Sequence, residues 1–169
     1  MGVVAQPSAN LYVDPTVAQM NDLLGKNISE ICRCELHGAS LNHCAHFVSH
    51  VMKYQFGYTC YNQTSKGSRA DRANIRVQEV FPQCRSVGRW ANKPATLTTG
   101  LVFITHENNV DIAKKTMVNV PRKHIGIFIE GTIYHYSNSR DAVVSQTPDQ
   151  FSHHYPGAGI AMFYGELPV

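Results

Sequence analysis

One cysteine of the chain stands where it could act as a nucleophile. Cys44 opens an apolar stripe at helical spacing, whose later members are Phe47, Val48, Val51 and Met52. The unpaired N–H groups and the dipole of a helix N-terminus stabilise an anion, so we expect the pKa of this thiol to be lowered. The alternative is that Cys44 fills the core with the rest of the stripe.

Two histidines of the second half could serve such a thiol. His124 begins one apolar stretch and His135 lies near the end of the next, with Glu130-Gly131 as a tight turn between them. A thiol nucleophile needs a base, and the base needs an orienting partner. We therefore predict the Cys44 sulfur within about 4 Å of a ring nitrogen of His124. The alternative is that both histidines are surface residues at strand ends.

The elements that must position these residues divide the chain into two halves. The first half predicts helices over residues 15–24, 44–52 and 75–81, with Ser40 and Asn42 as candidate N-caps of the second helix. The second half predicts strands near residues 101–104, 124–129, 132–136, 143–145 and 160–164. Helices followed by strands indicate an α+β fold with a mostly antiparallel sheet. We expect one domain over residues 1–169, in which residues 1–13 form a loose tail.

Composition excludes several classes of protein. The 169 residues carry 15 Lys and Arg against 12 Asp and Glu, and a net charge of +3 does not argue for a nucleic-acid partner. No run approaches the roughly 18 apolar residues of a membrane span, and the N-terminus lacks the regions of a secretory signal peptide. We expect a protein made in the cytoplasm, without membrane insertion, that reaches a periplasm or extracellular space by a signal-independent route.

Four segments in order resemble the NlpC-type papain-fold cysteine peptidases. Asn42–Val48 (NHCAHFV) is similar to the nucleophile segment, and Gly100–Ile104 to the strand before the catalytic histidine. Lys123–Ile129 (KHIGIFI) is similar to the histidine strand, and Ile133–Tyr136 to the strand that bears the third polar residue. The resemblance implies a papain-like fold in which the nucleophile helix packs on the sheet.

The same resemblance implies the roles of single residues. Cys44 is the nucleophile, His124 the general base and acid, and His135 the residue that orients His124, with Asp141 and then Asn138 as alternatives for the third role. The backbone N–H of Cys44 helps to hold the oxyanion. The second oxyanion donor is unassigned, because residues 24–28 lack the tyrosine that the family often carries upstream of its cysteine.

The implied chemistry is amide hydrolysis through a thioester, without a cofactor. Many relatives cut peptides of the bacterial cell wall, and small members include amidase toxins delivered by type VI secretion. The expected substrate is a peptidoglycan stem peptide or another amide, and an immunity protein is a candidate partner. A thiol acyltransferase, a deamidase and a non-catalytic papain-like binding module are the alternatives.

A metal site is the rival interpretation of the histidines near Cys44. His46 and His50 have the i, i+4 spacing of helical metal ligands, but the chain has no His-Glu-x-x-His motif. Cys32-x-Cys34 lacks the two-residue spacer of common zinc knuckles. Because His43, His46 and His50 lie mainly off the Cys44 stripe, we expect solvated histidines and no metal.

Three further features of the sequence are a basic stretch, an expected insertion and the remaining cysteines. The basic residues Lys66, Arg69, Arg72 and Arg76 predict a solvated face or, alternatively, a contact for an anionic substrate. Residues 107–122 are expected to be an insertion that shapes the substrate groove. Cys60 and Cys84 could pair in an oxidising compartment, and the odd number of five cysteines leaves at least one free thiol, which we assign to Cys44.

Overall fold

The computed structural model describes residues 14–32, 43–54 and 75–167. Several predictions therefore lie outside the described residues: the tail over 1–13, the N-caps at Ser40 and Asn42, most of the basic stretch, and any pairing of Cys60. Cys84, the other member of that pair, is a buried free thiol.

The helices of the first half confirm the predicted ones. Helix α1 (Val17–Leu23) begins at Thr16, whose hydroxyl accepts from the N–H of Gln19, and ends just before Gly25. Gly25 has a φ of +82°, a left-handed conformation that glycine adopts without strain. The short helix η1 spans Ile28–Glu30, and α2 spans Cys44–Met52. Helix α3 (Val77–Val80) runs directly into η2 (Phe81–Gln83).

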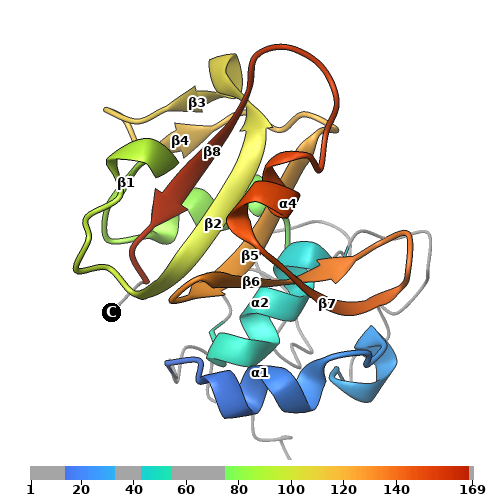
Figure 1. Ribbon diagram of the computed structural model, residues 1–169. Coiled ribbons are helices and arrows are strands. Elements are labelled where there is room, and N and C mark those ends of the chain that lie inside the picture. Colours follow the sequence, from blue (N-terminus) through green and yellow to red (C-terminus); the bar gives the residue numbers. More distant parts are fainter. Residues whose placement is uncertain (1–13, 33–42, 55–74, 168–169) are drawn as a thin grey trace, which may run out of the picture.

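A six-stranded antiparallel sheet forms the second half, in the order β1-β8-β2-β5-β6-β7 (Figure 1). The strands are β1 (Val87–Arg89), β2 (Thr99–His106), β5 (Lys123–Ile129), β6 (Thr132–Ser137), β7 (Ala142–Gln146) and β8 (Ile160–Gly165). The predicted turn joins β5 to β6 through Glu130 and Gly131, and Glu130 takes the left-handed conformation, with φ 55°. The protein is therefore α+β, as the order of its elements predicts.

The elements that the sequence did not predict are short. Besides β1 they are η3 (Trp90–Asn92), η4 (Glu107–Asn109), β3 (Val110–Asp111), β4 (Thr116–Met117) and α4 (Pro148–Ser152). Strands of two or three residues are too short to show the alternation of apolar and polar residues from which a strand is predicted. The β3–β4 hairpin and η4 lie within the expected insertion, and they line a cavity with Arg89 and Phe163 that includes none of the predicted site residues.

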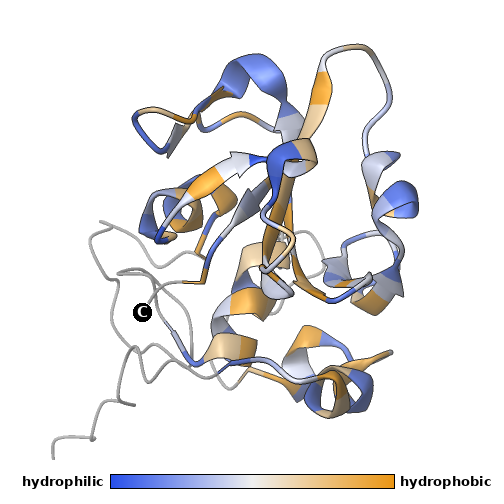
Figure 2. Cartoon of the chain, turned by 60° about the vertical axis from the view of Figure 1, so that its left-hand side comes forward, coloured by the Kyte–Doolittle hydropathy of each residue, from blue (hydrophilic) through white to orange (hydrophobic). Residues whose placement is uncertain are grey.

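The sheet has a different cover on each face. Alternate residues of β5 and β6 point to opposite faces. Ile125, Ile127 and Tyr136 belong to the larger core, which they share with α2, whereas Phe128 and Ile133 belong to a smaller core with Phe151 of α4. Figure 1 shows α2 below the sheet and α4 in front of it, and Figure 2 shows hydrophobic residues on α2 and on the strands above it.

Candidate functional site

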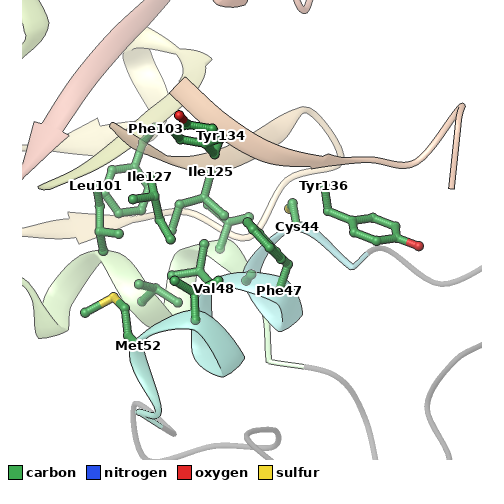
Figure 3. Close-up of a cluster of buried hydrophobic side chains, with 14 of the residues drawn as sticks. Cys44, Phe47, Val48, Met52, Leu101, Phe103, Ile125, Ile127, Tyr134 and Tyr136 are labelled. Carbon is green, nitrogen blue, oxygen red and sulfur yellow. The ribbon is translucent and has the colours of Figure 1, made fainter. Parts of the chain in front are cut away.

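Helix α2 brings Cys44 against the sheet at its first residue. All nine residues of the helix are buried, and Cys44 is 1% exposed. Its N-cap is His43, whose backbone N–H donates to Oδ1 of Asn138 at 3.3 Å. Figure 3 shows Cys44 on the side of the helix that faces the strands, near Tyr136. The sequence thus predicts this helix and its first residue correctly, but the N-cap is His43 and not one of the predicted candidates, Ser40 and Asn42.

The Cys44 sulfur lies where the pairing of β5 with β6 stops. The described ladder runs from the turn to the pair Ile127–Tyr134. Ile129 and Thr132 flank a two-residue turn, so the N–H groups of Ile129, Ile127 and Ile125 all point towards β6. The N–H of Ile125 is directed at the Cys44 sulfur instead of a ladder partner on β6. The thiol therefore occupies the wedge where the two strands separate.

The environment of the thiol corrects one expectation. Burial raises the pKa of Cys44 to about 11, although the N–H groups of Ile125, Ala45 and Cys44 itself act in the opposite direction. The predicted lowering of the pKa by the helix N-terminus is wrong for this structure, because the loss of water outweighs the effect of the N–H groups. The resting sulfur is a protonated thiol.

His124 and His135 form a hydrogen-bonded chain across the same wedge. Nε2 of His124 lies 2.8 Å from Nδ1 of His135, and Nε2 of His135 lies 2.7 Å from Oε1 of Gln146. An amide oxygen only accepts, so Nε2 of His135 carries its proton and Nδ1 of His135 accepts. Nε2 of His124 then carries a proton in turn. This order of donors leaves Nδ1 of His124 with a lone pair, as a base requires.

The surroundings of His124 keep its ring neutral. Burial holds the pKa of His124 well below its usual range, and the nearby rings of His154 and His135 act in the same direction. His124 is 1% exposed, and the exposed His154 stacks on it with ring centroids 4.0 Å apart. Burial also lowers the pKa of His135, to about 4. Both imidazoles are therefore neutral at pH 7.

The structure brings two of the three predicted residues together directly. His124 and His135 share the face of the sheet that α4 covers, where both rings lie near Phe151. Cys44 approaches the wedge from the face that α2 covers, and its sulfur meets the backbone of Ile125, the neighbour of His124. The hydrogen bonds found for His124 within the described residues link it to His135 and not to Cys44, so the predicted contact between the Cys44 sulfur and a ring nitrogen of His124 is not present as a hydrogen bond.

The alternatives for the third role have other partners. Oδ1 of Asp141 accepts from the hydroxyl of Tyr136 at 2.7 Å, and that hydroxyl accepts from the N–H of Ile28 at 2.9 Å. Asn138 accepts from the N–H of His43, as described above. Neither side chain is hydrogen-bonded to His124, so the geometry favours His135 for the orienting position.

A glycine keeps the two histidine strands close. Gly126 faces the same way as His124. A Cβ added there would lie 2.9 Å from Cγ2 of Ile133 and 3.2 Å from Cβ of His135. Any larger residue at position 126 would have to push β6 and His135 away from β5.

A polar cavity of about 380 Å³ opens beside these histidines. His135 and His154 line it together with Gln146, Gln150 and Arg140. The cavity therefore reaches the His135–Gln146 end of the hydrogen-bonded chain, and Arg140 adds a positive charge to its wall; neither Cys44 nor His124 is among the residues that line it.

A second buried group lies next to Cys44. Nε2 of His46 is 3.1 Å from the sulfur of Cys32, and Nδ1 of His46 is 3.1 Å from Nδ1 of His43. The prediction of solvated histidines is wrong, because His43, His46 and His50 are exposed by only 1%, 0% and 8%. The sequence carries a signal for this outcome: residues 44–52 contain no Asp, Glu, Lys or Arg, which is typical of a helix buried on all sides.

No family model matches the chain, and no curated protein or solved structure matches it significantly. Among the described residues, no helix is both long enough and apolar enough to cross a membrane.

Proposed function

We propose that this protein is a cysteine-dependent amide hydrolase with a papain-like arrangement, and that it cuts peptide bonds of bacterial peptidoglycan. The observation that carries the proposal is the hydrogen-bonded chain from Gln146 through His135 to His124, from which the order of protons is inferred. That order supports a neutral His124 whose Nδ1 can accept a proton, beside the strand position that holds the Cys44 thiol. Peptidoglycan as substrate rests on the four family-like segments.

In the proposed reaction the thiol proton moves to Nδ1 of His124 as the Cys44 sulfur attacks the amide carbon. His135 stabilises the imidazolium that forms, since its Nδ1 accepts from Nε2 of His124. The C–N bond then breaks, and His124 returns the proton to the leaving amine. Water, activated by His124, attacks the thioester, releases the carboxylic acid and restores the thiol.

The closed resting site is compatible with this scheme. The thiol and the imidazole of His124 are both buried, so a substrate must displace a cover before it can react. His154 stacks on His124 from the solvent side and lines the polar cavity, which makes its side chain the nearest such cover. Catalytic hydrogen bonds are often long or poorly aligned in a resting site and tighten only when substrate binds.

The proposal is tested by incubating the protein with purified peptidoglycan and identifying the released fragments by mass spectrometry. Cys44→Ala should release none of the fragments that the wild type releases. Cys84→Ala is the matched control, because it removes a buried thiol that contacts the carbonyl oxygen of Val80 and should leave the release unchanged. Equal release by Cys44→Ala and wild type would overturn the thiol mechanism. A product joined to an added amine would identify an acyltransferase instead.

A further inference from the structure

We propose that Cys32, His46 and His50 form a binding site for a structural zinc ion. One ligand atom from each of the three residues lies within 4.8 Å of the others, and all three side chains are buried. The site involves neither Cys44 nor the His124–His135 chain, so it stands independently of the proposed hydrolase activity.

The three donors match the chemistry of zinc. Zinc favours thiolate and imidazole ligands in a tetrahedron, at about 2.3 Å to sulfur and about 2.0–2.1 Å to nitrogen. These bond lengths place neighbouring ligand atoms about 3.3–3.6 Å apart. The sulfur of Cys32 and Nε2 of His46 already lie 3.1 Å apart. Small side-chain rotations would bring the three atoms, now within 4.8 Å, to these spacings. The described residues supply three of the four ligands that a tetrahedral ion takes.

An outer hydrogen bond supports the same assignment. Histidines that bind a metal usually engage their second ring nitrogen with a partner that fixes the ring orientation. Nδ1 of His46 has such a partner in Nδ1 of His43, at 3.1 Å. With the proton of that hydrogen bond on His46, Nε2 presents its lone pair to Cys32. A zinc ion would replace the proton that the Cys32 thiol otherwise shares with this nitrogen, and the thiol would bind as the thiolate.

The position of the site indicates its structural role. His46 and His50 are one helical turn apart on α2, while Cys32 comes shortly after η1. An ion held by all three would join the N-terminal part of the chain to the helix that carries Cys44. The ion would therefore hold the start of that helix in place.

Metal analysis of the purified full-length chain tests this inference. We expect about one zinc per chain in the wild type, and at least a tenfold loss of zinc affinity in Cys32→Ser and in His50→Asn. After replacement by cobalt, the wild type should show the thiolate-to-cobalt charge-transfer band and the d–d spectrum of a tetrahedral ion. Cys32→Ser should lose the charge-transfer band.

Two control variants identify the thiol that is involved. Cys84→Ser removes a different buried thiol, and Cys44→Ser removes the thiol nearest to His46 in the sequence, so both should keep the band. Loss of the band in Cys44→Ser but not in Cys32→Ser would overturn the proposed ligand set. If Cys32→Ser does not fold, the wild-type spectrum decides. A wild type that binds neither zinc nor cobalt contains only a hydrogen-bonded Cys–His–His chain, and the proposal fails.

Discussion

Two buried histidine clusters lie on opposite sides of the sheet, and they differ in what surrounds them. Cys32, His46 and His50 meet in the α2 layer, where every side chain is enclosed. His124 and His135 lie on the α4 face, where their chain of hydrogen bonds ends at a polar cavity.

The contrast shows how the same side chain can serve two purposes. A compact set of donors without access to solvent can bind an ion but cannot meet a substrate. A row of hydrogen-bonding groups that runs from His124 through His135 to an open cavity can move a proton. The proposals therefore give the first cluster a structural role and the second cluster a role in a reaction, and three measurements test this division.

The largest expected effect is a difference in hydrolysis rate between variants of the two clusters. His124→Ala removes the proposed base and should lower the rate of amide hydrolysis by roughly 10³-fold or more, with circular dichroism unchanged. His50→Ala should lower the rate only in proportion to the fraction of protein that loses its fold. Initial rates divided by the folded fraction give the comparison. Equal losses per folded molecule in the two variants would contradict the division.

The second effect concerns the stability of the His124–His135 cluster against acid. The pKa of His135 is about 4 in the folded protein, against an ordinary value near 6.5, because the ring is buried. As the pH falls below 6.5, the unfolded chain binds a proton at this histidine before the folded protein does. The stability that the neutral ring contributes is therefore complete above pH 6.5 and is lost as the pH falls through about 4. For this histidine, the free energy of unfolding falls by about 3 kcal/mol over that range.

Urea unfolding at a series of pH values measures how the free energy of unfolding changes with pH. His124 and His154 face His135, and burial lowers the pKa of each of them as well, so all three add in the same direction. His135→Gln should flatten the curve between pH 6.5 and 4. A wild-type stability that stays constant over that range would contradict the burial of neutral histidines.

The third and smallest effect compares the candidates for the orienting role. His135→Ala should lower kcat by about 10- to 100-fold, because His124 loses the partner that fixes its tautomer. Asp141→Asn keeps a residue that tolerates the left-handed φ of 52° and should leave kcat within a few-fold of the wild type. Asn138→Ala should behave in the same way. A larger loss in Asp141→Asn than in His135→Ala would move the third role to Asp141.

Much of the fold can be predicted from the sequence, because its main elements are strongly patterned. The stripe that starts at Cys44 locates α2, and the apolar runs on both sides of Glu130-Gly131 locate the β5–β6 hairpin. Helix α4 was not predicted, although Thr147 and Gln150 form a capping box that could have indicated its start.

The site is harder to predict, because it depends on where strands stop pairing. The sequence does not fix which face His124 and His135 occupy on either side of the turn, and it does not show that the pairing of β6 with β5 ends at Tyr134. The protonation of Cys44 depends on how completely the sheet and its neighbours exclude water, and this is set by tertiary packing. The absence of charged residues over 44–52 signals the burial of His46, but the contact of His46 with Cys32 is set by tertiary packing.

Position 126, a glycine, should tolerate almost no substitution. The position has no side chain and performs no chemistry, yet the close approach of Ile133 and His135 leaves no room for even a methyl group. In a saturation screen it would therefore be as intolerant of substitution as the residues of the proposed reaction. A map of intolerant positions on this protein would mark a spacer between two strands alongside the proposed nucleophile and the proposed base.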